Sequence, residues 1–227
     1  MPAKQFVISK QIFAFLRDLS RHNDKAWMDA NRERYRNELM EPFRALFDCF
    51  APVARELNRR FSMSGRVGVN FSRINRDIRF AKDKTPYRPQ MYLFFGEGDG
   101  EAGQLYIGAS PEIVTCGFRI YGHKRVSPLV RFGRRRGVEN ATWIERQRHR
   151  LARGYESYWY STEKGERTKH AGWPAKVEDW KKLQGWIVRK KFAPSAVART
   201  RFHSEVCKIF RETYPLCRFA GSSDWKA

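Results

Sequence analysis

The sequence has no long apolar segment. Lys10 and Arg17 bracket its first hydrophobic run, and no stretch approaches the roughly 20 apolar residues that a membrane-spanning helix needs. We therefore expect no membrane partner and a cytoplasmic location.

Closely spaced cysteines are also missing. The four cysteines, Cys49, Cys116, Cys207 and Cys217, contain no C-x-x-C pair. This spacing indicates neither a zinc site nor a redox-active disulfide. We expect buried thiols in a reducing compartment.

Several enzyme signatures are absent from the chain. It has no G-x-S-x-G elbow, no H-E-x-x-H helix, no H-x-E with C-x-x-C, and no G-x-x-x-x-G-K-[ST] phosphate loop. A magnesium-dependent nuclease would need clustered carboxylates. Asp77 and Asp83 lie among cations and are interpreted as ion-pair partners. We expect no metal and no cofactor, and the sequence does not say whether a reaction is catalysed.

Acidic residues are scarce compared with basic ones. The chain has 24 Asp and Glu against 45 Lys and Arg, a formal charge of +21. Residues 119–153 contain eleven Lys or Arg against two Glu, a local +9. Such an excess favours polyanionic partners through phosphate neutralisation and counterion release. Nucleic acid is the obvious candidate, although a purely solubilising charge would look the same.

The basic segment predicts a specific set of nucleic-acid contacts. Residues 140–154 are predicted to form a helix with one densely cationic face. Aromatic residues follow directly, as in grooves that stack single-stranded bases. We prefer the alternative that Tyr158 and Tyr160 are strand residues packing on the helices. The arginines proposed to contact nucleic acid are Arg134, Arg135, Arg136, Arg146, Arg150 and Arg153.

The most specific stretch of the chain is RINRDIRFAKDKTPYRP, from Arg73 to Pro89. Interpreted as a strand, it places Ile74, Arg76, Ile78 and Phe80 on one apolar face. An arginine on such a face needs a carboxylate, backbone carbonyls or a bound anion, because an unpaired buried charge is too costly.

We interpret this stretch as an anion pocket for a phosphate-bearing small molecule. Arg76, Arg79 and Lys84 would meet the anion, while Asp77 and Asp83 orient them. An internal ionic network that ties the stretch to the N-terminal helices carries nearly equal weight. The candidate ligand-binding residues are Arg73, Arg76, Asp77, Arg79, Lys82, Asp83, Lys84, Tyr87 and Arg88.

The hydrophobic pattern predicts one α+β domain spanning residues 1–227. Helical periodicity covers about 9–61, with Asn23 as a cap. A sheet-containing part covers about 65–192, and a terminal helix covers about 195–214, ended by Pro215. Alternation predicts strands at 91–95, 105–108, 113–121 and 186–192. The helices are expected to cover a mostly antiparallel sheet.

Two motifs carry a resemblance to a known family. The order R-D-x-R-F-x-x-D-K-T-P-Y-[KR] follows an F-L-x-x-L-x-x-x-N-D-x-x-W pattern that runs from Phe15 to Trp27. In these motifs, and along most of its length, the chain resembles the family called domain of unknown function 2461. The family is uncharacterised, so the resemblance implies no catalytic roles.

Overall fold

The computed structural model describes residues 10–97, 103–121, 136–163, 166–197, 201–221 and 225. Its centre is a six-stranded sheet in the order β1-β2-β3-β6-β4-β5, in which every neighbouring pair is antiparallel. The predicted α+β class and antiparallel sheet are confirmed. The strands are β1 (Met91–Phe95), β2 (Gln104–Ala109), β3 (Val114–Tyr121), β4 (Glu156–Glu163), β5 (Glu166–Ala171) and β6 (Gly185–Phe192).

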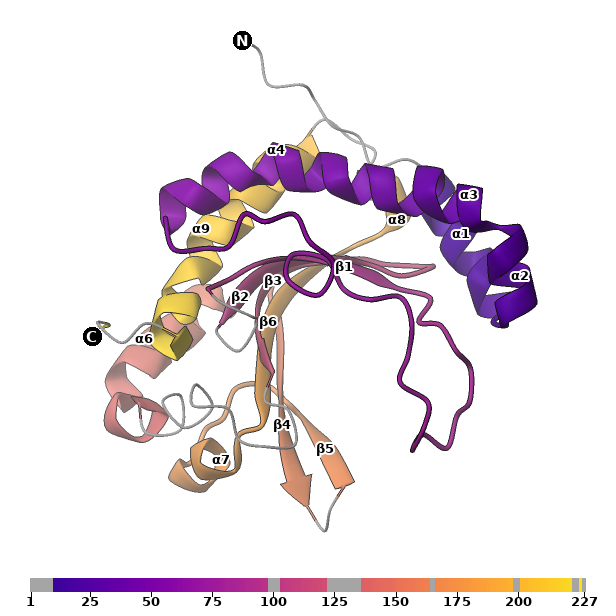
Figure 1. Cartoon of the computed structure of the whole chain (residues 1–227). Helices are drawn as coiled ribbons and strands as arrows, with labels where there is room; N and C mark the ends of the chain where they lie inside the picture. Colours follow the sequence, from indigo (N-terminus) through magenta and orange to yellow (C-terminus); the bar gives the residue numbers. More distant parts are fainter. Residues whose placement is uncertain are drawn as a thin grey trace.

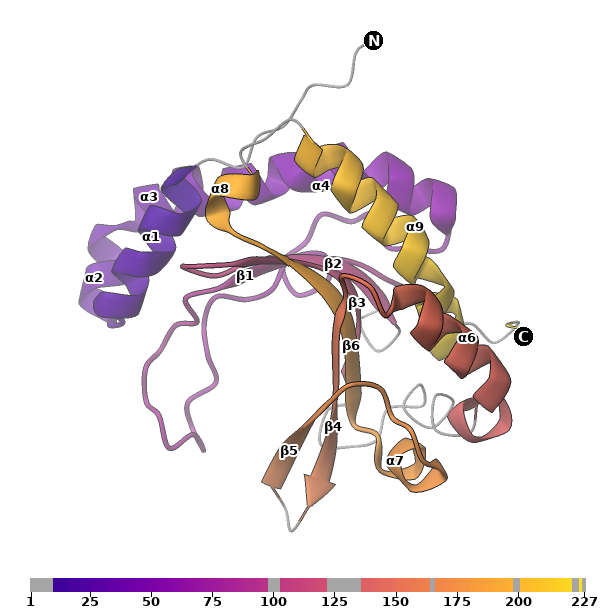
Figure 2. The same ribbon diagram turned by 180° about the vertical axis from the view of Figure 1, so that it is seen from behind.

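Helices cover one face of this sheet. Figure 1 shows α4 and α9 crossing above it, and the first three helices extend the same layer to one side. Figure 2 shows the same arrangement from behind. The N-terminal elements are α1 (Lys10–Arg21), α2 (Lys25–Ala30), α3 (Arg32–Arg34), the π-helical η1 (Tyr35–Met40) and α4 (Glu41–Leu57). The later ones are α6 (Ala141–Leu151), α7 (Val177–Lys182), α8 (Pro194–Val197) and α9 (Arg201–Gly221).

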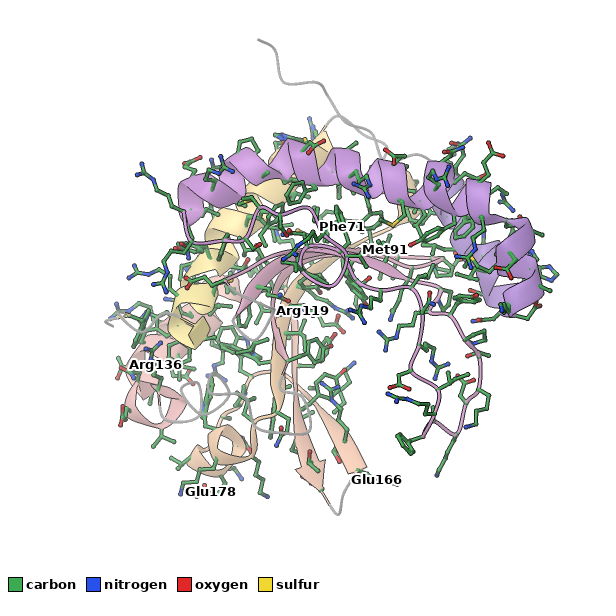
Figure 3. All side chains as sticks on the ribbon, viewed as in Figure 1. Phe71, Met91, Arg119, Arg136, Glu166 and Glu178 are labelled. Atoms are coloured by element: carbon green, nitrogen blue, oxygen red, sulfur yellow. The ribbon has the colours of Figure 1, made fainter. Side chains whose placement is uncertain are left out.

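The two faces of the sheet follow from the alternation of side chains along each strand. In β3, Cys116, Phe118 and Ile120 are buried in the main core together with the helices. Arg119 and Tyr121 point to the opposite face, and Figure 3 places Arg119 on the side away from α4. The hydrophobic cluster on that second face consists of strand residues alone. We call it the open face.

An aromatic cluster closes the core where α6, α7, β6 and α9 meet. The ring of Phe219 stacks on Trp143 at 4.7 Å between centroids and meets Trp225 edge-on at 5.1 Å. Trp180 and Trp186 meet the same ring at 6.0 and 6.4 Å. Trp173 adds a further edge contact to Trp186.

Two local predictions about the helices are wrong. Asp24, and not Asn23, caps α2, because its side chain accepts from the Trp27 N–H at 2.8 Å. The last helix does not end at Pro215 but continues to Gly221. Buried residues before and after the proline, Thr213 and Leu216 among them, hold the helix in the core despite the missing N–H.

The cysteines agree with the sequence analysis in part. All four are free thiols, and Cys116, Cys207 and Cys217 are buried, whereas Cys49 is half-buried. Burial raises the pKa of the Cys116 thiol well above its usual value. In the part of the chain that the structure describes, no helix is long and apolar enough to cross a membrane.

Candidate anion site

The stretch from Arg73 to Pro89, which we call the motif loop, is not a strand. Its two arms share a single bridge, Asn75 with Tyr87, and two flanking backbone hydrogen bonds of 2.8 Å. Pro86 and Pro89 have no N–H to donate, which limits any longer ladder. The loop projects toward the side of the sheet that the helices leave open (Figures 1 and 2).

Cations at the tip of the motif loop are held by the loop itself. Arg76 Nη1 donates to Asp83 and to the Thr85 hydroxyl. Lys84 Nζ donates to the Ile78 carbonyl at 3.1 Å. The backbone N–H of Thr85 and the Arg76 guanidinium lower the pKa of Asp83 to about 2.

This ionic network is exposed. The Asp83 side chain that pairs with Arg76 is 59% exposed, and Phe80, expected on an apolar face, is 94% exposed. The Phe80 prediction is therefore wrong. The tie to the N-terminal helices is neutral: Asn23 donates to the Tyr87 carbonyl at 2.9 Å and accepts from its N–H at 3.0 Å.

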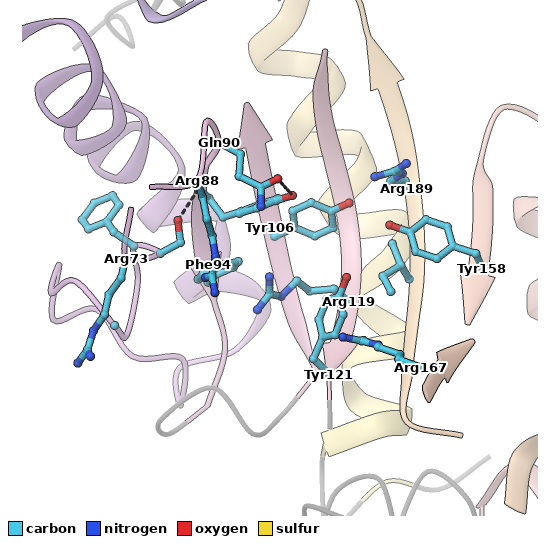
Figure 4. A pocket seen from close by; sticks show the side chains of 15 residues that line it. Arg73, Arg88, Gln90, Phe94, Tyr106, Arg119, Tyr121, Tyr158, Arg167 and Arg189 are labelled. Carbon is cyan, nitrogen blue, oxygen red and sulfur yellow. Dashed lines mark hydrogen bonds between the residues drawn. The ribbon is translucent and has the colours of Figure 1, made fainter. Parts of the chain in front are cut away.

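A pocket of about 630 Å³ opens on the open face, between the motif loop and strands β1 to β6. This volume lies within the roughly 300–1,000 Å³ of small-molecule sites. We call it the arginine pocket, and Figure 4 shows it from close by. The described residues that line it are Gly68, Phe71, Ser72, Arg73, Arg88, Gln90, Tyr92, Phe94, Tyr106, Arg119, Tyr121, Tyr158, Arg167, Ile187 and Arg189.

Strand register builds the floor of the pocket in rows. Phe94 faces Tyr106, which faces Gly117, which in turn faces Arg189. Gly117 has a φ of +156°, and a Cβ there would come 2.2 Å from the Val188 carbonyl oxygen. The position therefore requires glycine, because the backbone of Val188 and Arg189 occupies the space that a side chain would need.

Arg119 lies at the centre of the floor and rests on aromatic rings. Its guanidinium carbon is 3.9 Å from the centroid of Phe94 and 4.9 Å from that of Tyr121. Its Nε donates to Gln104 Oε1 at 3.0 Å. Burial lowers the pKa of Arg119, and no described carboxylate lies within ion-pair distance. Cation–π contacts therefore support a charge that the described residues leave without a counterion.

The far wall holds two more arginines with different partners. Arg167 lies 3.8 Å from the ring centroid of Tyr160 and 4.8 Å from that of Tyr121, with no ion pair among the described side chains. Arg189 donates to Glu156 at 2.7 Å. Burial raises the pKa of Glu156, but hydrogen bonds from Lys191 and Arg189 outweigh this effect and lower it.

The rim of the pocket comes from the segment before β1. Arg73 lies across Gly68, whose φ of +89° suits glycine and whose Cβ position would be 3.7 Å from Arg73 Nε. Buried Asn70 ties this turn to β1 by donating to the carbonyls of Ser62 (2.8 Å) and Phe94 (2.9 Å). Its Oδ1 also accepts from the Gly65 N–H at 2.9 Å.

Of the nine predicted ligand-binding residues, the structure brings only Arg73 and Arg88 into the pocket lining. Tyr87 is buried beside Asn23, at the base of the motif loop. The others lie at or near the tip of the loop: Arg76, Asp77, Arg79, Lys82, Asp83 and Lys84.

The sequence analysis missed Arg119, Arg167 and Arg189 as partners in one site. They lie on β3, β5 and β6, and only the strand order places them together. One signal was present: alternation in residues 113–121 sets Arg119 on the face opposite Phe118. No strand was predicted at 166–171, so nothing in the sequence indicated that Arg167 would face this site.

The predicted nucleic-acid contacts fall into three groups. Arg134 and Arg135 lie outside the described residues. Arg136 donates to the Phe219 carbonyl at 2.7 Å near the end of α9, and Arg150 donates to the Glu212 carbonyl at 2.6 Å. The remaining two, Arg146 and Arg153, are exposed.

The tyrosines after the basic helix lie in β4, as preferred, but pack on the open face and not on the helices. Lys169 Nζ lies 4.1 Å from the ring centroid of Tyr158, and Arg189 lies 4.9 Å from it. Arg167 covers Tyr160. These rings therefore support cations.

The other clusters of reactive side chains are less suited than the arginine pocket to binding a ligand. Ser161 Oγ lies 2.8 Å from His170 Nε2, and Glu163 lies 3.7 Å from the same nitrogen. Ser161 is fully buried, so a substrate has no access to its hydroxyl. Within the described ranges, no three His, Cys, Asp or Glu side chains gather as a metal site.

Comparison with known proteins gives one positive result. No curated protein matches the chain. The family described as "Conserved hypothetical protein (DUF2461)" matches residues 11–219, which include both sequence motifs. The chain therefore belongs to the DUF2461 family.

Proposed function

We propose that this protein binds a small anionic ligand, bearing phosphate or carboxylate groups, in the arginine pocket. One observation carries the proposal: five arginines line the pocket, and none of its described lining residues is acidic. Guanidinium groups bind phosphate and carboxylate oxygens through paired, charge-assisted hydrogen bonds.

The charge balance of the pocket supports an anion. Glu156 pairs with Arg189 and also with Lys191. The other four lining arginines, Arg73, Arg88, Arg119 and Arg167, form no ion pair with a described carboxylate. Arg119 is partly buried, whereas Arg73, Arg88 and Arg167 are exposed. A bound anion would supply the counterion that the described carboxylates do not supply.

The lining favours binding over acid–base chemistry. Its described members include no Asp, Glu, His, Lys or Cys that would serve as a general base near neutral pH. Burial raises the pKa values of Tyr106 and Tyr158, so both phenols stay protonated. They are neutral donors suited to holding an anion in place.

Calorimetric titration at low salt tests the proposal, with phosphate, pyrophosphate, sulfate, succinate and citrate as probes. The protein should bind at least one of them, and Arg119→Gln should weaken that binding at least about tenfold, because a charge-assisted contact is lost. Arg36→Gln is the matched control, since it removes the same charge from an exposed position on η1. Equal weakening by both variants, or no binding of any probe, would overturn the proposal.

Nucleic acid binding along residues 119–153 is a second proposal with narrower support. Arg146 and Arg153 are exposed and form no ion pair with a described residue. Two phosphate contacts would add about two units to the slope of the logarithm of affinity against the logarithm of salt concentration. The double variant Arg146→Gln/Arg153→Gln should remove that part of the slope, and an unchanged slope would contradict this proposal.

A further inference from the structure

Four lining arginines have no described carboxylate partner, and they come from separate elements. Arg73 and Arg88 lie at the rim, Arg119 on β3 and Arg167 on β5 (Figure 4). In the sheet order, β5 is the third strand along from β3, so their backbones are roughly 14 Å apart. The side chains of Arg119 and Arg167 nevertheless converge, because both guanidinium groups contact the ring of Tyr121.

The cations occupy two places in the pocket. Arg119 and Arg167 share one aromatic support and form a floor group. Arg88 lies at the rim beside Gln90, whereas Figure 4 shows the side chain of Arg73 turned away from it. Tyr92 donates to Gln90 Oε1 at 3.1 Å, which turns the amide N–H groups of Gln90 away from that hydroxyl. The rim therefore adds a neutral donor to the charge of Arg88.

Cations cover several of the aromatic rings in and beside the pocket. Arg119 lies over Phe94, Arg167 over Tyr160, and Lys169 over Tyr158. A ligand that stacked a planar base on these faces would displace a cation. The pocket therefore favours recognition through the number and placement of anionic groups.

The number of charges points to more than one anionic group. Four arginines of the lining have no described carboxylate partner, whereas a single phosphate monoester carries about −1.5 to −2 at pH 7. One phosphoryl group would neutralise about half of that charge and would occupy one group of arginines.

Resting on the proposed function, we infer that the ligand is a small molecule with at least two phosphoryl groups. One group binds the floor arginines Arg119 and Arg167, and the other binds Arg88 at the rim. Phosphoryl groups fit this arrangement better than carboxylates, since each offers more charge and a third acceptor oxygen to forked donors.

Calorimetric titration in metal-free buffer at low salt tests the inference, with inorganic phosphate, pyrophosphate, tripolyphosphate and citrate as probes. Pyrophosphate or tripolyphosphate should bind at least about 100-fold more tightly than phosphate, because the second group adds its own charge-assisted contacts. Equal affinities for phosphate and the longer probes would overturn the inference and leave the proposed function standing. Citrate binding as tightly as pyrophosphate would overturn the phosphoryl assignment alone.

Single-site variants locate the two groups. Arg88→Gln should reduce the preference for pyrophosphate over phosphate to less than about tenfold, while phosphate itself still binds at the floor. Arg36→Gln, with the same charge change on η1, should keep the full preference. An Arg88→Gln protein that keeps the full preference, with its circular dichroism unchanged, would overturn the rim assignment. Binding of none of the probes would instead remove the proposed function itself.

Discussion

The two faces of the sheet are built from the same strands and have opposite chemistry. On β3, Phe118 points into the helix-covered core and is fully buried, whereas the next residue, Arg119, points into the arginine pocket. The covered face gains free energy from removing apolar area from water. The open face holds four arginines that have no carboxylate partner among the described residues. Alternate residues of β3 therefore serve stability on one face of the sheet and the proposed anion binding on the other.

The largest effect should come from breaking the covered face. Phe118→Ala removes a ring that meets Trp186 edge-on at 5.2 Å, and we expect a loss of about 3–5 kcal/mol in the free energy of unfolding. Urea denaturation measures this loss. The folded fraction should still bind anions with the parent affinity, and a loss below about 1 kcal/mol would contradict the assigned packing.

A second test addresses the link between the two faces at Asn70. Asn70→Ala leaves buried backbone groups without partners and should cost on the order of 3 kcal/mol. It should also weaken anion binding, because the turn that carries Arg73 is no longer tied to β1. Asn75→Ala is the control, since its side chain is exposed. Equal stability losses in both variants, by urea denaturation, would count against this role.

A third test changes the charge of the open face at Glu156. Glu156→Gln releases Arg189 and should tighten anion binding severalfold, while costing at most about 1 kcal/mol because the pair is part-exposed. The pKa of Glu156 is lower in the folded protein than in the unfolded chain, where it is about 4.3. Its ion pairs therefore contribute fully to stability above about pH 4.3, and this contribution is lost as the pH falls through the folded-state pKa. The variant should lack this part of the acid dependence of unfolding. An unchanged anion affinity in titration would contradict the charge argument.

The smallest effect on stability should come from Arg119, next to the most damaging site. Arg119→Gln removes a desolvated charge that has no described carboxylate, so the unfolding free energy should change by less than about 1 kcal/mol, in either direction. At the same anion concentration, the melting temperature of the parent should rise by more than that of the variant. A large loss of stability without anion would show that Arg119 belongs to the core.

The sequence predicted the fold better than the site. Period-two alternation located β1, β2, β3 and β6, because one face of each strand must be apolar. The same kind of alternation wrongly predicted a strand from Arg73 to Phe80. Burial alternates there as far as Ile78, but the segment pairs with its own return arm at one bridge and ends in an exposed Phe80.

The site could not be assembled from the sequence for a physical reason. Strand order joins β3 to β6 and carries β5 to the edge, and local propensity does not specify these long-range pairings. Arg73 and Arg88 were found because the motif is dense in cations. Most of the remaining motif cations pair with carboxylates or carbonyls of the same loop, as Arg79 does with Asp77 at 2.7 Å.

The aromatic cluster around Phe219 gives the protein two separate optical signals. Five of its seven tryptophans meet at that corner, whereas the described lining of the arginine pocket contains tyrosines and no tryptophan. Tryptophan emission should therefore report when the end of α9 loosens from the core. Energy transfer among the clustered tryptophans should lower the polarisation of that emission. Tyrosine difference absorbance should follow occupancy of the pocket in the same cuvette.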